Sequence, residues 1–251
     1  MASVERFYDY FNNIIPSELS CEWDNDGRMC VPAPEKEVKK VLICLDVTNS
    51  VIDYAVENKF DCIISHHPMI FDPVRCVDGS NPIGRKICKL IKNDIAVFSF
   101  HTRLDKVKGG VNDALAEAME LKNVSDFSDV GRMGEVESVS LVAFAEKLKA
   151  NISADKIICV DGGKEVSKVA VVGGSGKGYL SEALLCGCDT FVTGEMPYNY
   201  EHDAKELGLN LICGGHYFTE NLVCSRIEKM VKDFDGEIIT EIIESNPAFV
   251  I

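Results

Sequence analysis

The sequence has no apolar run of about 18 residues, which excludes a transmembrane helix. Its opening residues, Met-Ala-Ser-Val-Glu-Arg, also lack the basic and then apolar order of a signal peptide. These two absences leave no reason to expect association with a membrane. We therefore expect a cytoplasmic protein.

Basic residues are scarce. The 26 lysines and arginines are outnumbered by 40 aspartates and glutamates, which gives a formal net charge of −14. Nucleic-acid binding depends on clustered lysine and arginine, and the densest basic run, Lys36 to Lys40, is interrupted by Glu37. The sequence therefore predicts no nucleic-acid partner, whereas its acidic surface favours solubility and the local concentration of metal cations.

Cysteine pairs with metal-binding spacing are absent, although the chain contains 11 cysteines. No Cys-x-x-Cys occurs, and Cys186 and Cys188 are too close together for the usual zinc spacing. A chain of 251 residues can bury about 70–75% of its unfolded surface, so it needs no disulfide or metal for stability. We expect reduced thiols, and any metal site is expected to serve function.

Predicted strands and helices alternate along the chain, which is typical of an α/β fold. In the first half, the pattern predicts helices over 4–15, 49–58 and 83–92 and strands over 41–46, 61–65 and 95–100. In the second half, it predicts strands over 169–172, 189–193 and 210–213 and helices over 179–185 and 202–207. A further helix is expected to open at Glu220 and to run to about Phe234.

The second half repeats the order of the first. Asp61 recurs 128 residues later as Asp189. The pair formed by His101 and a carboxylate four residues on recurs at His216, 115 residues later. A small deletion between the two blocks explains the change of offset. We interpret the repeat as an internal duplication of one α/β unit.

Histidine is rare, with five in the chain. Four of them follow the carboxyl ends of predicted strands, where open α/β sheets place their ligands: His66, His67, His101 and His216. The fifth, His202, is expected to be a surface residue of a helix. The four strand-end histidines are therefore the candidates for a functional site, the alternative being hydrogen-bonded polar turns.

The spacing of two histidines suits metal binding. If a helix starts near His216, Glu220 lies on the same face, about 5–6 Å away, which suits one metal or a carboxylate that bridges two. His101 and Asp105 repeat this spacing. Imidazole with carboxylate favours Zn, Fe, Mn, Co or Ni over Mg or Ca.

His66 and His67 are adjacent, and adjacent side chains of an extended strand point to opposite sides. One metal would not easily bind both, whereas two neighbouring metals could take one histidine each. By the offset of 128 residues, Glu195 is the counterpart of His67, which suggests a role in holding a ligand or in proton transfer.

A glycine-rich segment, Gly173 to Gly178, lies between a predicted strand and a predicted helix. Its backbone N–H groups could hold an anion, although the spacing fits neither the phosphate loop nor the dinucleotide fingerprint. The alternative is a tight strand-to-helix turn.

Several runs together resemble the NIF3-like family of dinuclear metal proteins, whose members are also catalogued as GTP cyclohydrolase 1 type 2 homologues. The matching runs occur in the family's order and span nearly the whole chain: 23–27 (Trp-Asp-Asn-Asp-Gly), 45–48 (Leu-Asp-Val-Thr), 65–71 (Ser-His-His-Pro-Met-Ile-Phe), 101–105 (His-Thr-Arg-Leu-Asp), 193–195 (Thr-Gly-Glu), and Gly215-His216 with Glu220. Arg103 departs from the pattern, since the family usually has Asn there, and Pro197 to Tyr200 is less typical.

The resemblance implies two divalent metal ions per subunit. His66 and Asp105 would hold one ion, His67 and His216 the other, and Glu220 would bridge them. It also implies a NIF3-like α/β fold of two intertwined lobes with mixed sheets, and a toroidal homohexamer whose metal sites face an internal cavity. We divide the chain into a first lobe of 1–125 with 214–251 and a second of 126–213. Some members insert a further domain mid-chain, for which this chain is too short.

The function expected from this resemblance is metal-dependent hydrolysis of a small molecule, with a metal-bridged water as nucleophile. His101 and Glu195 are the predicted catalytic residues, because either could move a proton. The family's naming suggests a nucleotide substrate such as GTP. Two alternatives remain open: a metal carrier or insertion factor without turnover, and an oligomeric interaction scaffold.

Overall fold

The computed structural model describes residues 2–249 and 251, which form two compact units. Unit 1 comprises the chain up to Val107 together with Val223–Asn246. Unit 2 comprises Lys108–Leu222 and the residues that follow Asn246. No helix within the described residues combines the length and the apolar character needed to span a bilayer.

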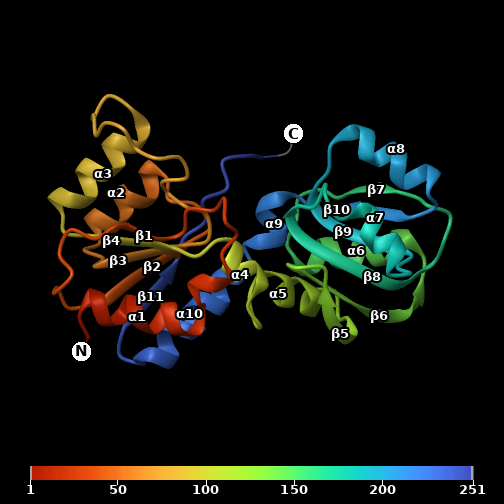
Figure 1. Ribbon diagram of the computed structural model, residues 1–251, viewed down its shortest axis with the longest axis horizontal. Helices are drawn as coiled ribbons and strands as arrows, with labels where there is room; N and C mark the ends of the chain where they lie inside the picture. Colours follow the sequence, from red (N-terminus) through yellow and green to blue (C-terminus); the bar gives the residue numbers. More distant parts are fainter. Residues whose placement is uncertain (1, 250) are drawn as a thin grey trace. The chain divides into compact units, whose positions relative to one another are not determined.

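Unit 1 is built on a five-stranded mixed sheet in the order β1-β4-β3-β2-β11 (Figure 1). Its strands are β1 (Gly27–Cys30), β2 (Lys40–Cys44), β3 (Cys62–Ser65), β4 (Ala96–Ser99) and β11 (Ile239–Ile242). All neighbours are parallel except β1, which runs antiparallel to β4. The helices of unit 1 are α1 (Val4–Ile14), the 3-10 turn η1 (Ser17–Leu19), α2 (Asn49–Glu57), α3 (Pro82–Lys92), α4 (Thr102–Lys106) and α10 (Val223–Phe234).

Helices cover both faces of the unit 1 sheet, α2 and α3 on one and α1 and α10 on the other (Figure 1). The strands β3 and β4 are buried at every position, as expected for parallel strands between two helical layers. The helix α1 buries Phe7 and Phe11 along one stripe, and the ring of Phe11 stacks on that of Phe100 at 5.4 Å.

Unit 2 contains a six-stranded mixed sheet in the order β5-β6-β8-β9-β10-β7. Its strands are β5 (Lys122–Phe127), β6 (Gly131–Val139), β7 (Ile158–Val160), β8 (Val166–Ser175), β9 (Thr190–Glu195) and β10 (Asn210–Cys213). The central β8, β9 and β10 are parallel, and the outer strands are antiparallel to their neighbours. The helices of unit 2 are α5 (Val111–Ala118), α6 (Leu141–Asn151), α7 (Leu180–Leu185), α8 (Tyr198–Glu206) and α9 (His216–Glu220).

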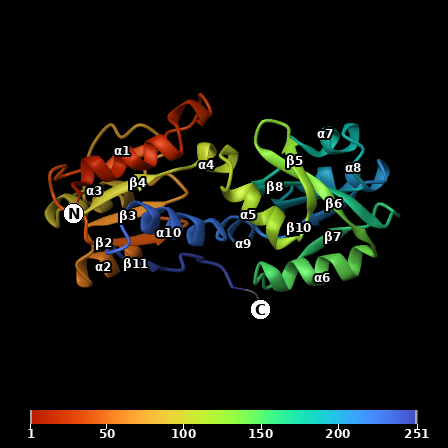
Figure 2. The same ribbon diagram turned by 90° about the horizontal axis from the view of Figure 1, so that it is seen from below.

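The two faces of the unit 2 sheet carry separate apolar cores. Residues of α5 and α6 pack with Val169, Val171 and Val192 on one face, whereas residues of α7 and α8 pack with Ala170 and Phe191 on the other. Successive residues of a strand point to opposite faces, which explains the alternation along β8. Figure 2 shows the strands of this unit from a second side.

The central strands of the two sheets repeat the same register. In unit 1, Val41 of β2 pairs with Cys62 of β3, and in unit 2, Val169 of β8 pairs with Thr190 of β9. Both partners are displaced by the same 128 residues. The α/β fold with two mixed sheets agrees with the expectation, and the shared register supports the internal duplication.

The division into units differs from the expected one. Segments 108–125 and 214–222 and the residues after Asn246 belong to unit 2, not to the first lobe. The reason is packing, since α5 contacts β8 and α9 contacts both β8 and β9. The hydrophobic pattern alone does not predict which of the two sheets a helix will pack on when the helix lies where the chain passes from one unit to the other.

One expected helix is in fact two. The helix α9 ends at Glu220, and a separate helix, α10, begins at Val223. The expectation that Glu220 opens a long helix is therefore wrong, although the helix-compatible pattern to Phe234 is present. The outer strands β1, β5, β6, β7 and β11 were not expected, because several are short, as β7 is, or carry mostly exposed side chains, as β5 does.

Candidate metal centre

Three histidines of unit 1 converge where the parallel strands β3 and β4 end. His66 and His67 follow Ser65, the last residue of β3, and His101 precedes the first turn of α4. Their ring centroids lie 5.0 Å (His66 to His67), 5.3 Å (His66 to His101) and 5.6 Å (His67 to His101) apart. One ring nitrogen of each lies within 4.8 Å of the others, so the three could hold a metal ion.

Each of these imidazoles is anchored through its Nδ1 atom. The oxygen partners are the Phe100 carbonyl for His66 at 2.9 Å, the Asp46 carboxylate for His67 at 2.7 Å and the Asp24 carboxylate for His101 at 2.9 Å. Because carbonyl and carboxylate oxygens accept hydrogen bonds, Nδ1 is the atom that donates. The lone pair of the neutral ring is then on Nε2, which is the usual arrangement of metal-binding histidines.

Asp105 faces His66, the residue with which the resemblance groups it. Its Oδ1 lies 3.6 Å from Nε2 of His66, whose side chain is fully buried. Asp105 lies on the short helix α4, which begins directly after His101 and brings the Asp105 carboxylate within reach of the His66 ring. A carboxylate and an imidazole nitrogen at this separation are suitable donors to one divalent ion.

The expectation that His66 and His67 point to opposite sides is wrong. The strand β3 ends at Ser65, and the backbone N–H of His67 donates to the Leu45 carbonyl at 3.0 Å. Because the chain has left the extended conformation at this point, the alternation rule no longer applies. Both rings therefore lie on the same side of the strand end.

Asp24 supports His101 from a buried position, with none of its side chain exposed. It accepts hydrogen bonds from Nδ1 of His101, and from the backbone N–H of Thr102 at 3.0 Å and its hydroxyl at 2.6 Å. Burial raises the pKa of Asp24, but the hydrogen bonds from His101 and Thr102 outweigh it and lower the pKa to about 2. The carboxylate therefore stays ionised at neutral pH and holds the ring in place.

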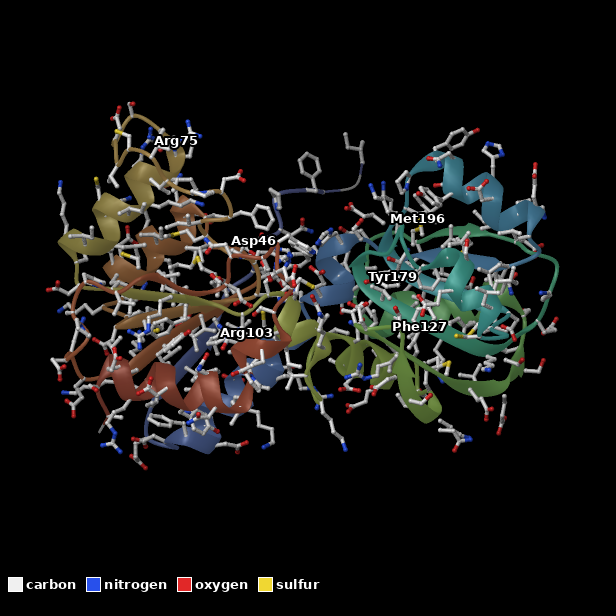
Figure 3. The ribbon with its side chains drawn as sticks, viewed as in Figure 1. Asp46, Arg75, Arg103, Phe127, Tyr179 and Met196 are labelled. Atoms are coloured by element: carbon white, nitrogen blue, oxygen red, sulfur yellow. The ribbon has the colours of Figure 1, made fainter. Side chains whose placement is uncertain are left out.

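Arg103, the residue that departs from the family pattern, is almost fully buried and serves the structure (Figure 3). Its Nε donates to Asp26 at 3.1 Å, and its Nη1 donates to Asn12 at 2.8 Å and to the Ile15 carbonyl at 3.0 Å. These bonds tie α4 to the end of α1 and to the 23–27 loop. The substitution thus leaves every candidate ligand of unit 1 in place.

Unit 2 contributes a second group of donors. The helix α9 begins at His216, and Nε2 of this residue lies 3.0 Å from Oε2 of Glu220. The two side chains therefore share one face of the helix, as their spacing of four residues predicted. Nδ1 of His216 lies 3.2 Å from Oε1 of Glu195, at the end of β9. Glu195 therefore holds His216 in the way that Asp46 holds His67.

The glycine-rich segment serves close packing against these donors. Gly174, in β8, has φ +62°, and a Cβ atom built there would lie 2.1 Å from Oε1 of Glu220 and 3.2 Å from Nε2 of His216. The N–H of Gly173 donates to Asn112, and that of Gly174 donates to Thr219. These two N–H groups are therefore committed to side chains, which favours a packing role over the anion cradle.

The donors are of the chemical types that bind divalent transition metals such as Zn, Fe, Mn, Co or Ni. Each unit presents imidazole nitrogens held by an oxygen on the far side of the ring, and unit 2 adds a buried carboxylate in the space that Gly174 leaves open. His202 lies apart from this chemistry, as expected, because it is exposed on α8 and contacts the ring of Tyr198 at 4.7 Å.

Two anchoring residues, Asp24 and Asp46, were not among the predicted site residues. Both stand within runs that carry the family resemblance, at 23–27 and 45–48. Asp46 lies two residues beyond the end of β2, at the same edge of the sheet as His67. A carboxylate at the carboxyl end of a parallel strand was the signal that could have found it.

Comparison with known proteins agrees with this architecture. Residues 2–247 match the family model described as Duf34/NIF3 (NGG1p interacting factor 3). A protein of Clostridium perfringens named "GTP cyclohydrolase 1 type 2 homolog" is 34% identical over 240 residues, covering 90% of this chain and 91% of its own. A protein of the same name from Methanocaldococcus jannaschii is 34% identical over 244 residues, covering 94% of this chain and 98% of its own.

The fold agrees as well. The crystal structure of a Bacillus cereus protein related to NIF3 superposes with a TM-score of 0.92 at 25% identity, covering 100% of this chain and 99% of the other. Sequence and structure thus match along essentially the whole length. The chain is therefore a member of the Duf34/NIF3 family.

Proposed function

We propose that this protein is a metal-dependent hydrolase with two divalent ions per subunit. In this proposal His66 and Asp105 bind one ion, His67 and His216 bind the other, and Glu220 bridges them. The observation that carries the proposal is the anchoring of all four strand-end histidines, each held at Nδ1 by an oxygen. Such anchoring fixes the tautomer and direction that metal ligation requires.

Divalent ions bound by these residues would lower the pKa of water toward neutrality and so supply a hydrolytic nucleophile. The contribution of the chain is to hold the ligands and to move protons. His101 is positioned to take up a proton at Nε2, because Asp24 keeps the proton on Nδ1. Glu195, whose side chain is 59% exposed, is the second proposed proton carrier.

The proposed substrate is a small molecule, with nucleotides as the first class to test. The support is indirect, since relatives that are 34% identical carry the name "GTP cyclohydrolase 1 type 2 homolog". We also propose a cytoplasmic homohexamer, on the family resemblance. Light scattering of the purified chain tests the assembly, and a monomer or dimer mass would contradict it.

Metal content per chain, measured on untagged protein before and after dialysis against a mild chelator, tests the centre. We expect about two equivalents that survive dialysis, and hydrolysis of one or more nucleotides or phosphoesters by the loaded protein. Glu220→Gln should fall to one equivalent or less, because the variant loses the bridging carboxylate. Asp203→Asn, which changes a carboxylate on α8, is the control and should retain both ions.

Other outcomes of this experiment would redirect the assignment. Two equivalents that wash out readily, without turnover, would favour a metal carrier or insertion factor. Two equivalents retained by Glu220→Gln would refute the bridging role. No metal at the start, and no uptake of Zn, Mn or Fe, would refute the metal centre and leave an interaction scaffold as the remaining function.

A further inference from the structure

Two exposed aromatic rings adjoin the histidines of unit 1. Trp23 is 64% exposed and Phe71 is 49% exposed, and their ring centroids lie 6.2 Å apart. Both rings meet the imidazole of His101 at a steep angle, Trp23 at 6.1 Å and 78° and Phe71 at 6.4 Å and 81°. We name this pair the aromatic platform. It has no assigned part in metal binding.

The platform is held in place by its own loops. The side-chain amide of Asn25 donates to the Ile70 carbonyl at 2.6 Å, which ties the segment that carries Trp23 to the one that carries Phe71. The backbone N–H of Asn25 donates to Asp24, which also holds His101. Exposed rings on fixed loops lose little conformational freedom when a ligand binds, so the platform is pre-organised.

The geometry favours a ligand that stacks. The two ring planes are tilted by 53°, so their faces are not stacked on each other. Small-molecule sites combine aromatic side chains with a small number of polar groups that fix the orientation of the ligand, and the platform and the adjoining histidines are such a combination. Planar heteroaromatic rings stack on tryptophan and phenylalanine irrespective of the exact base, because each has a π-face.

The charge of the proposed metal centre favours a ligand with a neutral ring over a cationic ligand. Aromatic clusters also bind cations through their π-faces, but this platform touches His101, which lies with His66 and His67 in the proposed metal centre. Divalent ions there would repel a second cation. The nearby carboxylate of Asp24 does not offset this, because it is buried and engaged by His101 and Thr102.

We infer that Trp23 and Phe71 bind the uncharged, planar heteroaromatic ring of the substrate, such as a nucleobase, and present the attached group to the histidines. This inference rests on the proposed function, because it names the substrate class of the same site. The chain offers a direct probe, since Trp23 is its sole tryptophan. Fluorescence excited selectively at tryptophan therefore reports on the platform, without a contribution from the seven tyrosines.

The experiment titrates the full chain with guanosine, adenosine and ribose 5-phosphate, with and without added Zn, and follows the fluorescence of Trp23. We expect saturable quenching by both nucleosides and none by ribose 5-phosphate, which has no base. Phe71→Ala should weaken nucleoside binding about 10-fold, since stacking of one base on one aromatic ring contributes roughly that much. Tyr198→Ala, which removes another exposed ring beside a histidine, should bind like wild type.

Phe71→Leu serves as a second variant that keeps apolar bulk in the loop and removes the π-face. Weakened binding in both Phe71 variants supports stacking. Equal affinity of wild type and both variants, or the absence of saturable quenching, would overturn the inference. A fluorescence change that follows protein concentration and not nucleoside concentration would also overturn it, because a second copy of the chain would then cover the platform.

Metal content measured on the same samples separates the two proposals. Retained metal without nucleoside quenching would refute the platform and leave the metal centre standing. Quenching without any metal uptake would support the platform and refute the proposed centre.

Discussion

The two units are built on one repeated core but carry different chemistry at the same edge. The shared part is structural. Oδ2 of Asp61 accepts the backbone N–H groups of Lys39 and Lys40 at 2.9 and 3.0 Å, and Oδ2 of Asp189 accepts those of the residues 128 positions later at 3.1 and 2.8 Å. A duplicated hydrogen bond of this kind is a property of the scaffold, not of the site.

The strand ends differ instead. After β2, unit 1 has Asp46, which anchors His67, and at the equivalent position unit 2 has Gly174, which makes room for Glu220. The histidine pair that follows β3 is replaced in unit 2 by glycine and glutamate, since His67 corresponds to Glu195. The duplicated scaffold thus provides strand ends suited to ligands, and the residues placed there diverged. Unit 1 supplies several imidazoles, and unit 2 supplies one imidazole with a buried carboxylate.

The largest expected effect comes from filling the space beside Glu220. Gly174→Ala places a Cβ atom 2.1 Å from Oε1 of Glu220 at a residue with φ +62°. We expect a loss of about 3 kcal/mol in the free energy of unfolding, from strain and overpacking, and loss of bound metal. Urea unfolding and metal analysis measure both. Gly178→Ala is the control, because nothing lies within 4 Å of its Cβ position, and an unchanged metal content in Gly174→Ala would contradict the packing role.

The two equivalent aspartates, Asp61 and Asp189, should contribute different amounts to the free energy of unfolding. Asp189 accepts from two backbone N–H groups and from the hydroxyls of Ser167 and Thr190, whereas Asp61 accepts from two backbone N–H groups and pairs with Lys36. We expect Asp189→Ala to lower the free energy of unfolding by roughly 3 kcal/mol and Asp61→Ala by roughly 2 kcal/mol. Chemical denaturation of both variants checks this order. The reverse order would mean that the ion pair of Asp61 outweighs the additional hydroxyl bonds of Asp189.

The anchors of the histidines should affect metal affinity more than stability. Asp46→Asn weakens the acceptor for Nδ1 of His67, and loss of such a partner typically lowers metal affinity about 10- to 100-fold. Competition with a fluorescent chelator measures the change. Asp53→Asn, which alters an exposed aspartate of α2 paired with Lys89, should leave metal affinity unchanged. Equal affinity of Asp46→Asn and wild type would show that this anchor is not needed.

The sequence predicted the buried parallel strands and the histidines at their ends well, because both follow from local patterns. The strand predicted over 210–213 agrees with the structure, whereas the helix expected to open at Glu220 does not, because α9 already begins at His216. The outer strands did not follow from the pattern, since an edge strand such as β5 exposes most of its side chains and shows no buried run. The anchoring by Asp24 depends on a hydrogen bond across 77 residues, which no local pattern predicts.

The smallest expected effect is a difference in acid stability between the buried anchor Asp24 and the exposed anchor Glu195. The pKa of Asp24 is about 2 in the folded chain, below its ordinary value of 3.8, so its contribution to stability is present above pH 4 and is lost as the pH falls toward 2. The contribution is at most about 2 kcal/mol. Metal-free wild type should therefore lose more stability than Asp24→Asn between pH 5 and 2, as urea unfolding at several pH values would reveal.

Glu195 provides the matched test in unit 2. It anchors His216 as Asp24 anchors His101, but 59% of its side chain is exposed, and exposed pairs contribute little to stability. Glu195→Gln should accordingly lose stability in acid in parallel with wild type. If both variants followed wild type, burial of Asp24 would have no energetic consequence. If both diverged equally from wild type, the two anchors would be equivalent, and the difference between the units would lie in their ligands alone.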